Sequence, residues 1–340
     1  MNALAYNVLR LLSDGEFHSG ATMAHAAKVS RASVWNAVQK IEAAGLDVFS
    51  VRGRGYRLER PLVMLDATLV SQLLGETAPF TLEIVDETDS TNTLLLRRMQ
   101  AGVPGLSKTS EVPHASVIAA EWQRAGRGRM NRPWHAAVGG ALTFSVLWRF
   151  SQGAAGLAGL SLAVGLAVVR ALESVGVSGV GLKWPNDVLW RGRKIAGSLI
   201  EMQGDALGPS AVVIGAGINV RLPPAMGSRI DQAAADLETI LNTSSAHPFD
   251  RNQLLAALLG ELNRVLMEFE RAGFKAFRDD WQRRHVHQGC PVRLTLSGGI
   301  SETGLARGVR GDGALLLETA HGVKSFHSGD VSLRAVRRSA

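Results

Sequence analysis

The sequence predicts an α+β protein built from three parts, and three observations support this. Helical periodicity followed by a short hairpin pattern fills residues 1–65, helices and strands are interleaved over 66–285, and short strands fill 286–340. At 340 residues, the chain also exceeds the usual size of one domain, which favours two or three domains.

Composition narrows the classes of function. Hydrophobic residues make up 46% of the chain, enough for a sizeable core, yet no apolar run approaches the roughly 18–20 residues of a membrane span. The first residues lack the pattern of a secretory signal, and the single cysteine, Cys290, excludes an internal disulfide framework. We therefore expect a cytoplasmic protein in which Cys290 is a packed thiol. The net charge of +7 and the pI near 10.0 favour polyanionic partners, such as nucleic acid, nucleotide phosphates or an acidic protein.

The first 45 residues predict three helices. Apolar residues recur at near-helical spacing from Leu4 to Leu12. Ser19 and Ser30 are suitable N-caps for a second helix over Gly20–Ala27 and for a third helix that ends at Gly45.

A cationic hairpin is predicted after these helices, because apolar residues alternate on both sides of Arg52-Gly53-Arg54-Gly55. Three helices and such a hairpin resemble a winged helix-turn-helix, whose third helix enters the major groove while the wing follows the phosphate backbone. The groove-side residues would be Arg31, Ser33, Trp35, Asn36, Gln39 and Lys40, and the phosphate contacts would be Arg52 and Arg54. A protein-binding or purely structural domain is the alternative, and the cationic hairpin favours DNA.

A polar run marks the start of the central region, after an expected linker over Pro61–Asp66. Residues 86–93 follow a predicted strand over Thr81–Val85 and precede the apolar residues of a helix. The hydroxyl and amide groups of this run can cap the helix, or they can hydrogen-bond a neutral polar ligand. The run alone does not decide between these two interpretations.

The stretch GRGRMNRPW, residues 126–134, places three arginines and two glycines between two strand-like runs. Such a flexible cationic loop is suited to gripping an anion, although a solvated basic hairpin is the alternative. Farther along, KWPND at 183–187 holds a lysine before a Trp-Pro pair, which keeps Trp184 out of the helical region.

The rest of the central region predicts one buried helix and three strands. The helix is expected over Ala155–Val175, and the strands over Val188–Trp190, Ile195–Met202 and Val212–Val220. In the last strand, Gly215 and Gly217 permit a close approach of another group. Glu201 and Asn219 are polar residues that end two of these apolar strands, and they face either solvent or a nucleotide and its magnesium. No phosphate-binding GxxxxGK[ST] loop occurs, and no GxGxxG opens a helix after a strand.

This set of residues suits the activation of a carboxylate by ATP. The carboxylate and the α-phosphate are both anions, and two unit charges about 4 Å apart repel by roughly 4 kcal/mol at an effective dielectric near 20. Uncompensated, that repulsion would cost about three powers of ten in rate. Arginines on a glycine-rich loop and one nearby lysine can hold both anions, and the loop can close over a hydrolysable acyl-adenylate.

Taken together, GRGRMNRPW, KWPND, the segment Asp89–Asn92 and the strand GAGIN at 215–219 resemble the biotin–protein ligases in order and spacing. The N-terminal winged helix-turn-helix resembles that of the bifunctional subgroup, the biotin operon repressors. The resemblance implies three domains: a DNA-binding domain over 1–65, a catalytic domain over 66–285 related to class II aminoacyl-tRNA synthetases with a mixed sheet, and an SH3-like β-barrel over 286–340.

The resemblance also implies an activity and a set of site residues. ATP, with Mg²⁺, would convert biotin to biotinyl-5′-AMP, and a lysine of biotin carboxyl carrier protein would then accept the biotin. Operator DNA would be a second partner, bound by a homodimer when the adenylate is present. The implied roles are biotin binding by Ser90, Thr91, Asn92, Gln123, Arg127, Gly128, Arg129 and Lys183, catalysis by Lys183 and Arg129, and nucleotide contacts by Trp134 and Asn219.

Two departures from the family pattern occur in the loop, where many members have arginine and glycine instead of Met130 and Asn131. Asparagine tolerates left-handed backbone, so the turn can survive, whereas Met130 removes one positive charge. The alternatives that remain are a ligase with a vestigial winged helix, a ligand-sensing regulator without catalysis, and a lipoate–protein ligase.

Five short strands separated by glycine-containing turns are predicted after residue 286, which suits a small barrel. The histidines of this region do not have the compact spacing of metal ligands, so we expect none of them to bind a metal and leave the metal site unassigned. They are His285, His287, His321 and His327.

Overall fold

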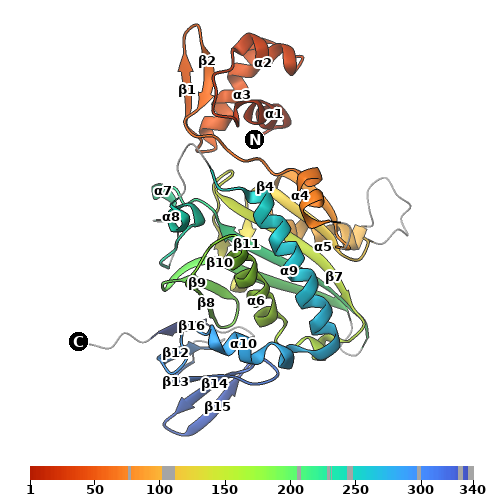
Figure 1. The fold of residues 1–340 in the computed structure, drawn as a ribbon, viewed down its shortest axis with the longest axis vertical. Coiled ribbons are helices and arrows are strands. Elements are labelled where there is room, and N and C mark those ends of the chain that lie inside the picture. The colour runs from red at the N-terminus through yellow and green to blue at the C-terminus, as the bar shows by residue number, and fades with distance from the viewer. Residues whose placement is uncertain are drawn as a thin grey trace, which may run out of the picture.

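The computed structural model describes residues 1–75, 78–101, 112–204, 208–227, 230, 232–242, 248–296, 300–327 and 332–335. The N-terminal helices and hairpin lie at one end of the long axis, the large sheet and its helices fill the middle, and the C-terminal strands lie at the other end (Figure 1). None of the helices within these ranges has the length and apolar content needed to cross a membrane.

The N-terminal part consists of three helices and one hairpin, as predicted. Each helix begins at a polar cap, since the side chains of Asn2, Ser19 and Ser30 each accept a hydrogen bond from a backbone amide of the first turn. The elements are α1 (Ala3–Leu12), α2 (Gly20–Ala26), α3 (Arg31–Ala43), β1 (Val48–Val51) and β2 (Gly55–Leu58). Apolar residues of α1, α2 and α3 form a buried cluster that also includes Leu58 of the hairpin and Val138 from the central region.

A seven-stranded mixed sheet forms the middle of the molecule, in the order β3-β4-β7-β11-β10-β9-β8. Only β3 and β4 pair in parallel, and each of the other neighbours is antiparallel. The strands are β3 (Thr81–Thr88), β4 (Ser116–Gln123), β7 (Ala141–Phe150), β8 (Val180–Lys183), β9 (Asp187–Trp190), β10 (Arg193–Gly204) and β11 (Ser210–Asn219).

Helices cover both faces of this sheet. The strand residues alternate accordingly: Ile118 and Leu147 pack with Leu95 of α5 (Thr91–Ala101), whereas Val117 and Val146 belong to the large core on the opposite face. On that face lie α4 (Ala67–Leu74), α6 (Leu160–Ser174) and α9 (Arg251–Ala272) (Figure 1). Three short helices complete the region: α7 (Pro224–Gly227), α8 (Leu237–Leu241) and α10 (Arg278–Arg283).

The single helix predicted over Ala155–Val175 is interrupted. A short 3-10 turn, η2 (Ala154–Leu157), precedes α6, and Gly159 between them has φ 83°. A Cβ at Gly159 would lie 2.6 Å from atoms of Phe274, which belongs to the 3-10 turn η3 (Phe274–Ala276). The close approach of this ring to the backbone therefore requires glycine, and the chain turns there before α6 begins.

The C-terminal part is an antiparallel sheet of five strands in the order β15-β14-β13-β12-β16, in agreement with the prediction of a small β domain. Its strands are β12 (Pro291–Thr295), β13 (Ser301–Val309), β14 (Leu315–Thr319), β15 (Gly322–Phe326) and β16 (Ser332–Ala335); Val331 of the predicted last strand lies outside the described residues. Its buried side chains belong to the same cluster as those of α6 and α9. The preceding segment joins the central sheet, because Leu182 N donates to Arg284 O (2.8 Å) and Val286 N donates to Leu182 O (3.0 Å).

The linker between the N-terminal part and the sheet is fixed by a buried ion pair. Arg251 is 1% exposed, and its guanidinium donates to Glu121 (2.6 Å) and to the carbonyl oxygen of Val63 (2.6 Å). The other carboxylate oxygen of Glu121 accepts from Leu65 N (2.5 Å), and Asn252 binds the carbonyl oxygen of Met64 (3.0 Å). The linker is thus hydrogen-bonded to β4 of the central sheet and to α9.

A second contact joins α1 to the end of β3. Tyr6 donates to Glu87 (3.4 Å), and Arg10 forms an ion pair with Asp86. Burial and the neighbouring carboxylates raise the pKa of the Tyr6 hydroxyl well above its usual range. The first helix therefore rests on the first two residues of the polar run at 86–93.

Candidate functional site

A cavity of about 540 Å³ opens at the edge of the central sheet. Its walls come from the start of α5, the end of β4, the loop after β4, the strands β8 to β11, and β16 of the C-terminal sheet. One end is lined by neutral polar groups and the other by cations.

The polar end is lined by Ser90, Thr91, Asn92 and Gln123, and the last three form a hydrogen-bonded group with Ser145. All five residues are less than 10% exposed. Thr91 donates to Gln123 Oε1 through its backbone amide (2.6 Å), while the hydroxyl of Ser145 contacts Thr91 Oγ1 (2.7 Å) and Asn92 Oδ1 (2.5 Å). A backbone amide can only donate, so the atom facing it must be the oxygen of Gln123. The amide nitrogen of Gln123 is thereby left to donate to another group.

Asn92 is held from its other side by a charged pair. Its Nδ2 donates to Glu201 (2.8 Å), and Arg127 binds both oxygens of the same carboxylate (2.9 Å each). Gly215 leaves space for this arrangement, since a Cβ there would lie 2.2 Å from Asn92 Oδ1. The close approach expected at Gly215 is thus observed, whereas Glu201 faces neither open solvent nor the cavity and instead pairs with Arg127 and Asn92.

The loop after β4 forms a small hairpin from β5 (Gly126–Arg127) and β6 (Pro133–Trp134), with the turn η1 (Arg129–Asn131) between them. Met130 and Asn131 have φ 56° and 54°, in the left-handed region. The turn expected to survive with asparagine does so, and Met130 adopts the same conformation although left-handed backbone costs roughly 1 kcal/mol for such a residue. The Met130 side chain is 48% exposed.

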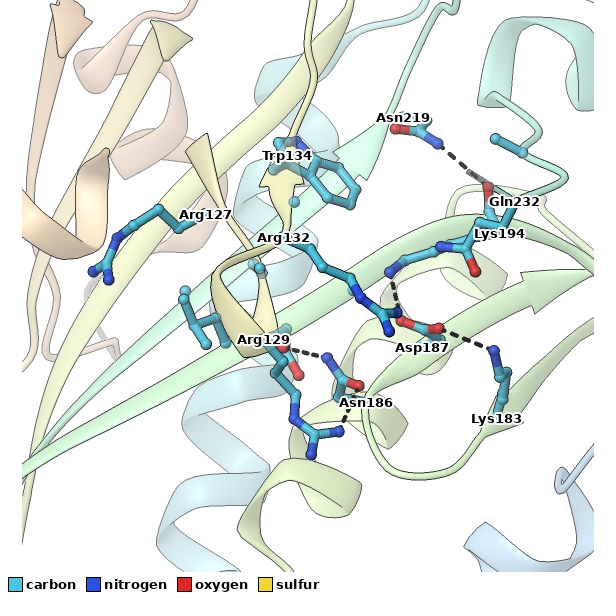
Figure 2. A pocket seen from close by; sticks show the side chains of 18 of the residues that line it. Arg127, Arg129, Arg132, Trp134, Lys183, Asn186, Asp187, Lys194, Asn219 and Gln232 are labelled. Atoms are coloured by element: carbon cyan, nitrogen blue, oxygen red, sulfur yellow. Dashed lines mark hydrogen bonds and ion pairs between the residues drawn. The ribbon is translucent and has the colours of Figure 1, made fainter. Parts of the chain in front are cut away.

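At the cationic end, Asp187 lies between two lysines (Figure 2). Its carboxylate is 3.6 Å from Lys183 Nζ and 2.5 Å from Lys194 Nζ. Arg129 reaches the same region and donates to Asn186 Oδ1 (3.3 Å). Figure 2 shows that Arg127 points away from Lys183, so the structure does not bring these two cations together.

Desolvation is the main electrostatic feature of this end. Burial lowers the pKa of Lys183, Asp187 opposes that effect, and the nearby charges of Lys194 and Arg334 lower the pKa further. A partly desolvated ammonium gains interaction energy when an anion enters the cavity, because little water competes for its charge.

Trp134 and Asn219 line another wall of the cavity, beside the cationic end (Figure 2). The Trp134 ring packs over Gly217, where a Cβ would lie 2.6 Å from the ring, and Lys194 Nζ is 5.7 Å from the ring centroid. Trp134 Nε1 is buried and has no hydrogen-bond partner within the described ranges. Asn219 uses its Nδ2 to bind the backbone carbonyls of Lys194 (3.3 Å) and Ala235 (3.1 Å), so it also fixes this wall.

Over 337 residues, the sequence is 34% identical to the bifunctional ligase/repressor BirA of Escherichia coli (strain K12), with 99% of both chains covered. The chain belongs to the biotin protein ligase family. The bifunctional ligase/repressor BirA of Bacillus subtilis (strain 168) is 30% identical over 336 residues, 98% of this chain and 99% of the relative. Family models match residues 5–57 (HTH domain), 86–219 (biotin/lipoate A/B protein ligase family) and 287–334 (biotin protein ligase C terminal domain).

Solved structures of biotin protein ligases agree with this assignment. The protein from Aquifex aeolicus, solved in complex with biotin and ATP, has a TM-score of 0.61 and 29% identity, and the match covers 75% of this chain and 99% of that chain. The expected α+β fold is thus confirmed. The expectation of a biotin–protein ligase relative with an N-terminal helix-turn-helix is confirmed as well.

The DNA-facing residues expected for this subgroup of the biotin protein ligases lie on α3 and at the tip of the β1–β2 hairpin. Arg31 and Asn36 are exposed on α3, and Arg52 and Arg54 are exposed at the tip of the hairpin. Ser33 is half-buried, and its hydroxyl contacts the cap residue Ser30 (2.9 Å). The remaining residues proposed to face the groove are also exposed, and they are Trp35, Gln39 and Lys40.

Several residues that line the cavity or hydrogen-bond its walls were not singled out by their sequence patterns. Ser145 lies in the middle of an apolar strand, and Lys194 precedes a shift in the pairing of β10 with β9. His287 and Arg334 reach the cavity from the C-terminal part. The described ranges contain no group of three or more His, Cys, Asp or Glu side chains that could hold a metal ion.

Proposed function

We propose that this chain is a bifunctional biotin–protein ligase and biotin-responsive repressor. It activates biotin with ATP to biotinyl-5′-AMP and transfers biotin to a lysine of biotin carboxyl carrier protein. The observation that carries the proposal is a single cavity that joins a neutral amide and hydroxyl end to a cationic end. The same chain begins with a winged helix-turn-helix.

The polar end is suited to the ureido ring of biotin. That ring offers one carbonyl acceptor and two N–H donors, and the Ser90 hydroxyl and the free amide nitrogen of Gln123 can bind it. Lipoate has no such groups at its ring, so its binding would leave these buried groups unpaired at a cost of about 1–3 kcal/mol each. The site therefore favours biotin over lipoate.

The cationic end then receives the biotin carboxylate and the α-phosphate. A carboxylate oxygen attacks the α-phosphorus, pyrophosphate leaves, and the mixed anhydride forms. Lys183 and Arg129 supply positive charge where negative charge accumulates, which lowers the barrier set by the repulsion of the two anions. Arg127 supports the biotin end instead, through Glu201 and Asn92.

We assign the nucleotide to the wall of Trp134 and Asn219. The unpaired indole Nε1 of Trp134 offers a donor to a bound nucleotide.

Asp187 is the carboxylate that lines the cavity, and two lysines already flank it, so the described residues do not form a protein-only magnesium site. Mg²⁺ would enter on the phosphates of ATP, the usual arrangement for this ion, and would neutralise their charge.

The repressor activity rests on the winged helix. Loading with the adenylate would promote a homodimer whose two third helices read the two halves of an operator. We place the protein in the cytoplasm, where carrier protein and DNA are both present, and we divide it into domains at residues 1–65, 66–285 and 286–340. A ligase with a vestigial winged helix is the alternative.

Incubation of the protein with biotin, ATP, Mg²⁺ and carrier protein tests the ligase. We expect a mass increase of one biotinyl group on a single carrier lysine, no product with lipoate, and loss of product in Lys183→Ala. Lys275→Ala, on the exposed turn η3, is a matched control that should retain activity. The absence of biotinylation by the wild-type protein would refute the enzyme.

A gel-shift experiment with duplex DNA from upstream of the biotin synthesis genes tests the repressor. Biotin and ATP together should produce the shift and increase the sedimenting mass to that of a dimer, and Arg52→Ala with Arg54→Ala should weaken binding. DNA binding that ignores biotin and ATP would leave the ligase but remove the repressor.

A further inference from the structure

His287 lies at the cationic end of the cavity although it comes from outside the central domain. It directly follows Val286, whose backbone amide binds the carbonyl oxygen of Leu182, the residue before Lys183. Both His287 and Lys183 line the cavity, together with Arg334 from β16. The C-terminal part thus supplies an imidazole next to the position proposed for the reacting carboxyl group.

The imidazole of His287 is available to accept a proton. Within the described ranges its ring makes no hydrogen bond, and its Nδ1 is buried without a partner. Burial, followed by the charge of Lys183, lowers its pKa to about 4, so the ring is neutral at physiological pH. The charged and titratable groups around it are Lys183 on β8, His285 on the same segment, and Arg334, whose charge acts on Lys183.

The transfer step needs such a base. The acceptor lysine has an ordinary pKa near 10.4, so only about one molecule in a thousand carries a free amine at neutral pH. Of the side chains that line the described cavity, Asp187, His135 and His287 could take the proton. Asp187 already pairs with two lysines, and His135 follows Trp134 at the wall assigned to the nucleotide. His287 is left as the base near the reacting carbonyl.

We propose that His287 is the general base of the second half-reaction, which rests on the ligase function proposed above. Its ring nitrogen takes a proton from the ammonium of the carrier lysine as the amine attacks the carbonyl carbon of the adenylate. The new C–N bond forms, the bond from that carbon to the phosphate oxygen breaks, and AMP leaves with the electron pair. The second proton of the attacking nitrogen passes to solvent.

The bound adenylate prepares His287 for this step. Its phosphate anion offsets the charge of Lys183, the smaller of the two causes that lower the pKa of the imidazole, and so raises that pKa above about 4. A base is most effective when its pKa lies near the working pH. His287 thus becomes a stronger base when the intermediate that needs it is present.

Single-turnover kinetics separate the two half-reactions. His287→Gln and His287→Ala should form biotinyl-5′-AMP from biotin and ATP at the wild-type rate and transfer biotin to carrier protein about 10²-fold more slowly. Added imidazole should restore transfer in His287→Ala, because the vacated space opens on the cavity. Hydroxylamine, which is a free amine at neutral pH, should react equally fast with the adenylate on all variants. His321→Gln, on an exposed turn of the same domain, is the matched control.

The outcomes are distinct. If wild-type protein makes no adenylate, the proposed function fails. If His287→Gln transfers biotin to carrier as fast as the wild type from a preformed adenylate, the role of His287 fails while the ligase stands. A variant that slows hydroxylamine and carrier equally, without rescue by imidazole, would show a structural role and also refute the proposal.

Discussion

Gly215 and Gly217 on β11 provide a test that separates the two ends of the cavity. Both glycines lie two residues apart on one strand, and neither has a positive φ, so alanine strains the backbone at neither position. In Gly215→Ala the new Cβ would lie 2.2 Å from Asn92 Oδ1, and in Gly217→Ala it would lie 2.6 Å from the Trp134 ring. Since ordinary contacts begin near 3.4 Å, Asn92 or Trp134 must move by about 1 Å.

The expected effects differ in kind. Displacing Asn92 breaks its hydrogen bonds to Ser145 and to the charged Glu201, each worth about 1–3 kcal/mol, so Gly215→Ala should weaken biotin binding by roughly 10- to 100-fold. Displacing Trp134 leaves the polar end intact, so Gly217→Ala should bind biotin normally and raise the KM for ATP by a similar factor.

Calorimetric titration with biotin and initial rates of pyrophosphate release at varied ATP measure the two quantities. Gly260→Ala on α9, where a Cβ meets nothing within 4 Å, is the control and should match the wild type in both. Wild-type biotin affinity in Gly215→Ala, or the same defect in both variants, would refute the assignment of the polar end to biotin and the opposite wall to the nucleotide.

Further predictions concern stability and the loop. Arg251→Met leaves Glu121 buried and unpaired, so it should lower the free energy of unfolding by about 3–5 kcal/mol, seen as a lower urea midpoint; an unchanged midpoint would contradict this. Burial, and then the charge of His287, lowers the pKa of His285 from 6.5 to about 4. Between pH 6.5 and pH 4 the unfolded state therefore binds the proton and the folded state does not, so the free energy of unfolding decreases as the pH falls. Between pH 6.5 and 5 the loss should be about 2 kcal/mol, and His285→Phe should remove that part of the slope; parallel slopes for the two proteins would disprove it. Met130→Ile, β-branched at φ 56°, should speed release of the adenylate, whereas Met130→Gly should release it at the wild-type rate or more slowly; equal release from both variants would rule out a role for this backbone conformation.

Local chemistry explains what could be predicted from the sequence. The N-caps at Ser19 and Ser30, the hairpin around Arg52 and the left-handed turn at Asn131 depend on residues within a few positions of each other. Such features can be predicted from the sequence because the residues that cause them lie within the same short segment of the chain.

The rest of the site depends on packing between distant segments. The interaction of Arg127 with Glu201 joins residues 74 positions apart, and a short loop gives no sign that one of its arginines faces a carboxylate on another strand. Lys194 enters the cavity next to a register shift in the pairing of β10 with β9. Such an irregularity changes the direction of a side chain, so the alternation of residues along a regular strand does not predict it. His287 belongs to the site because its segment joins β8.

The hydrogen-bonded linker has a consequence for the motion of the molecule in solution. Because Arg251, Glu121 and Asn252 bind the backbone of residues 63–66, the 65-residue N-terminal part is not attached by a flexible tether. Its backbone amides should report the rotational correlation time of a 36.2 kDa particle instead of that of a small independent domain. The third helix would then present itself to DNA at an orientation fixed by the catalytic body.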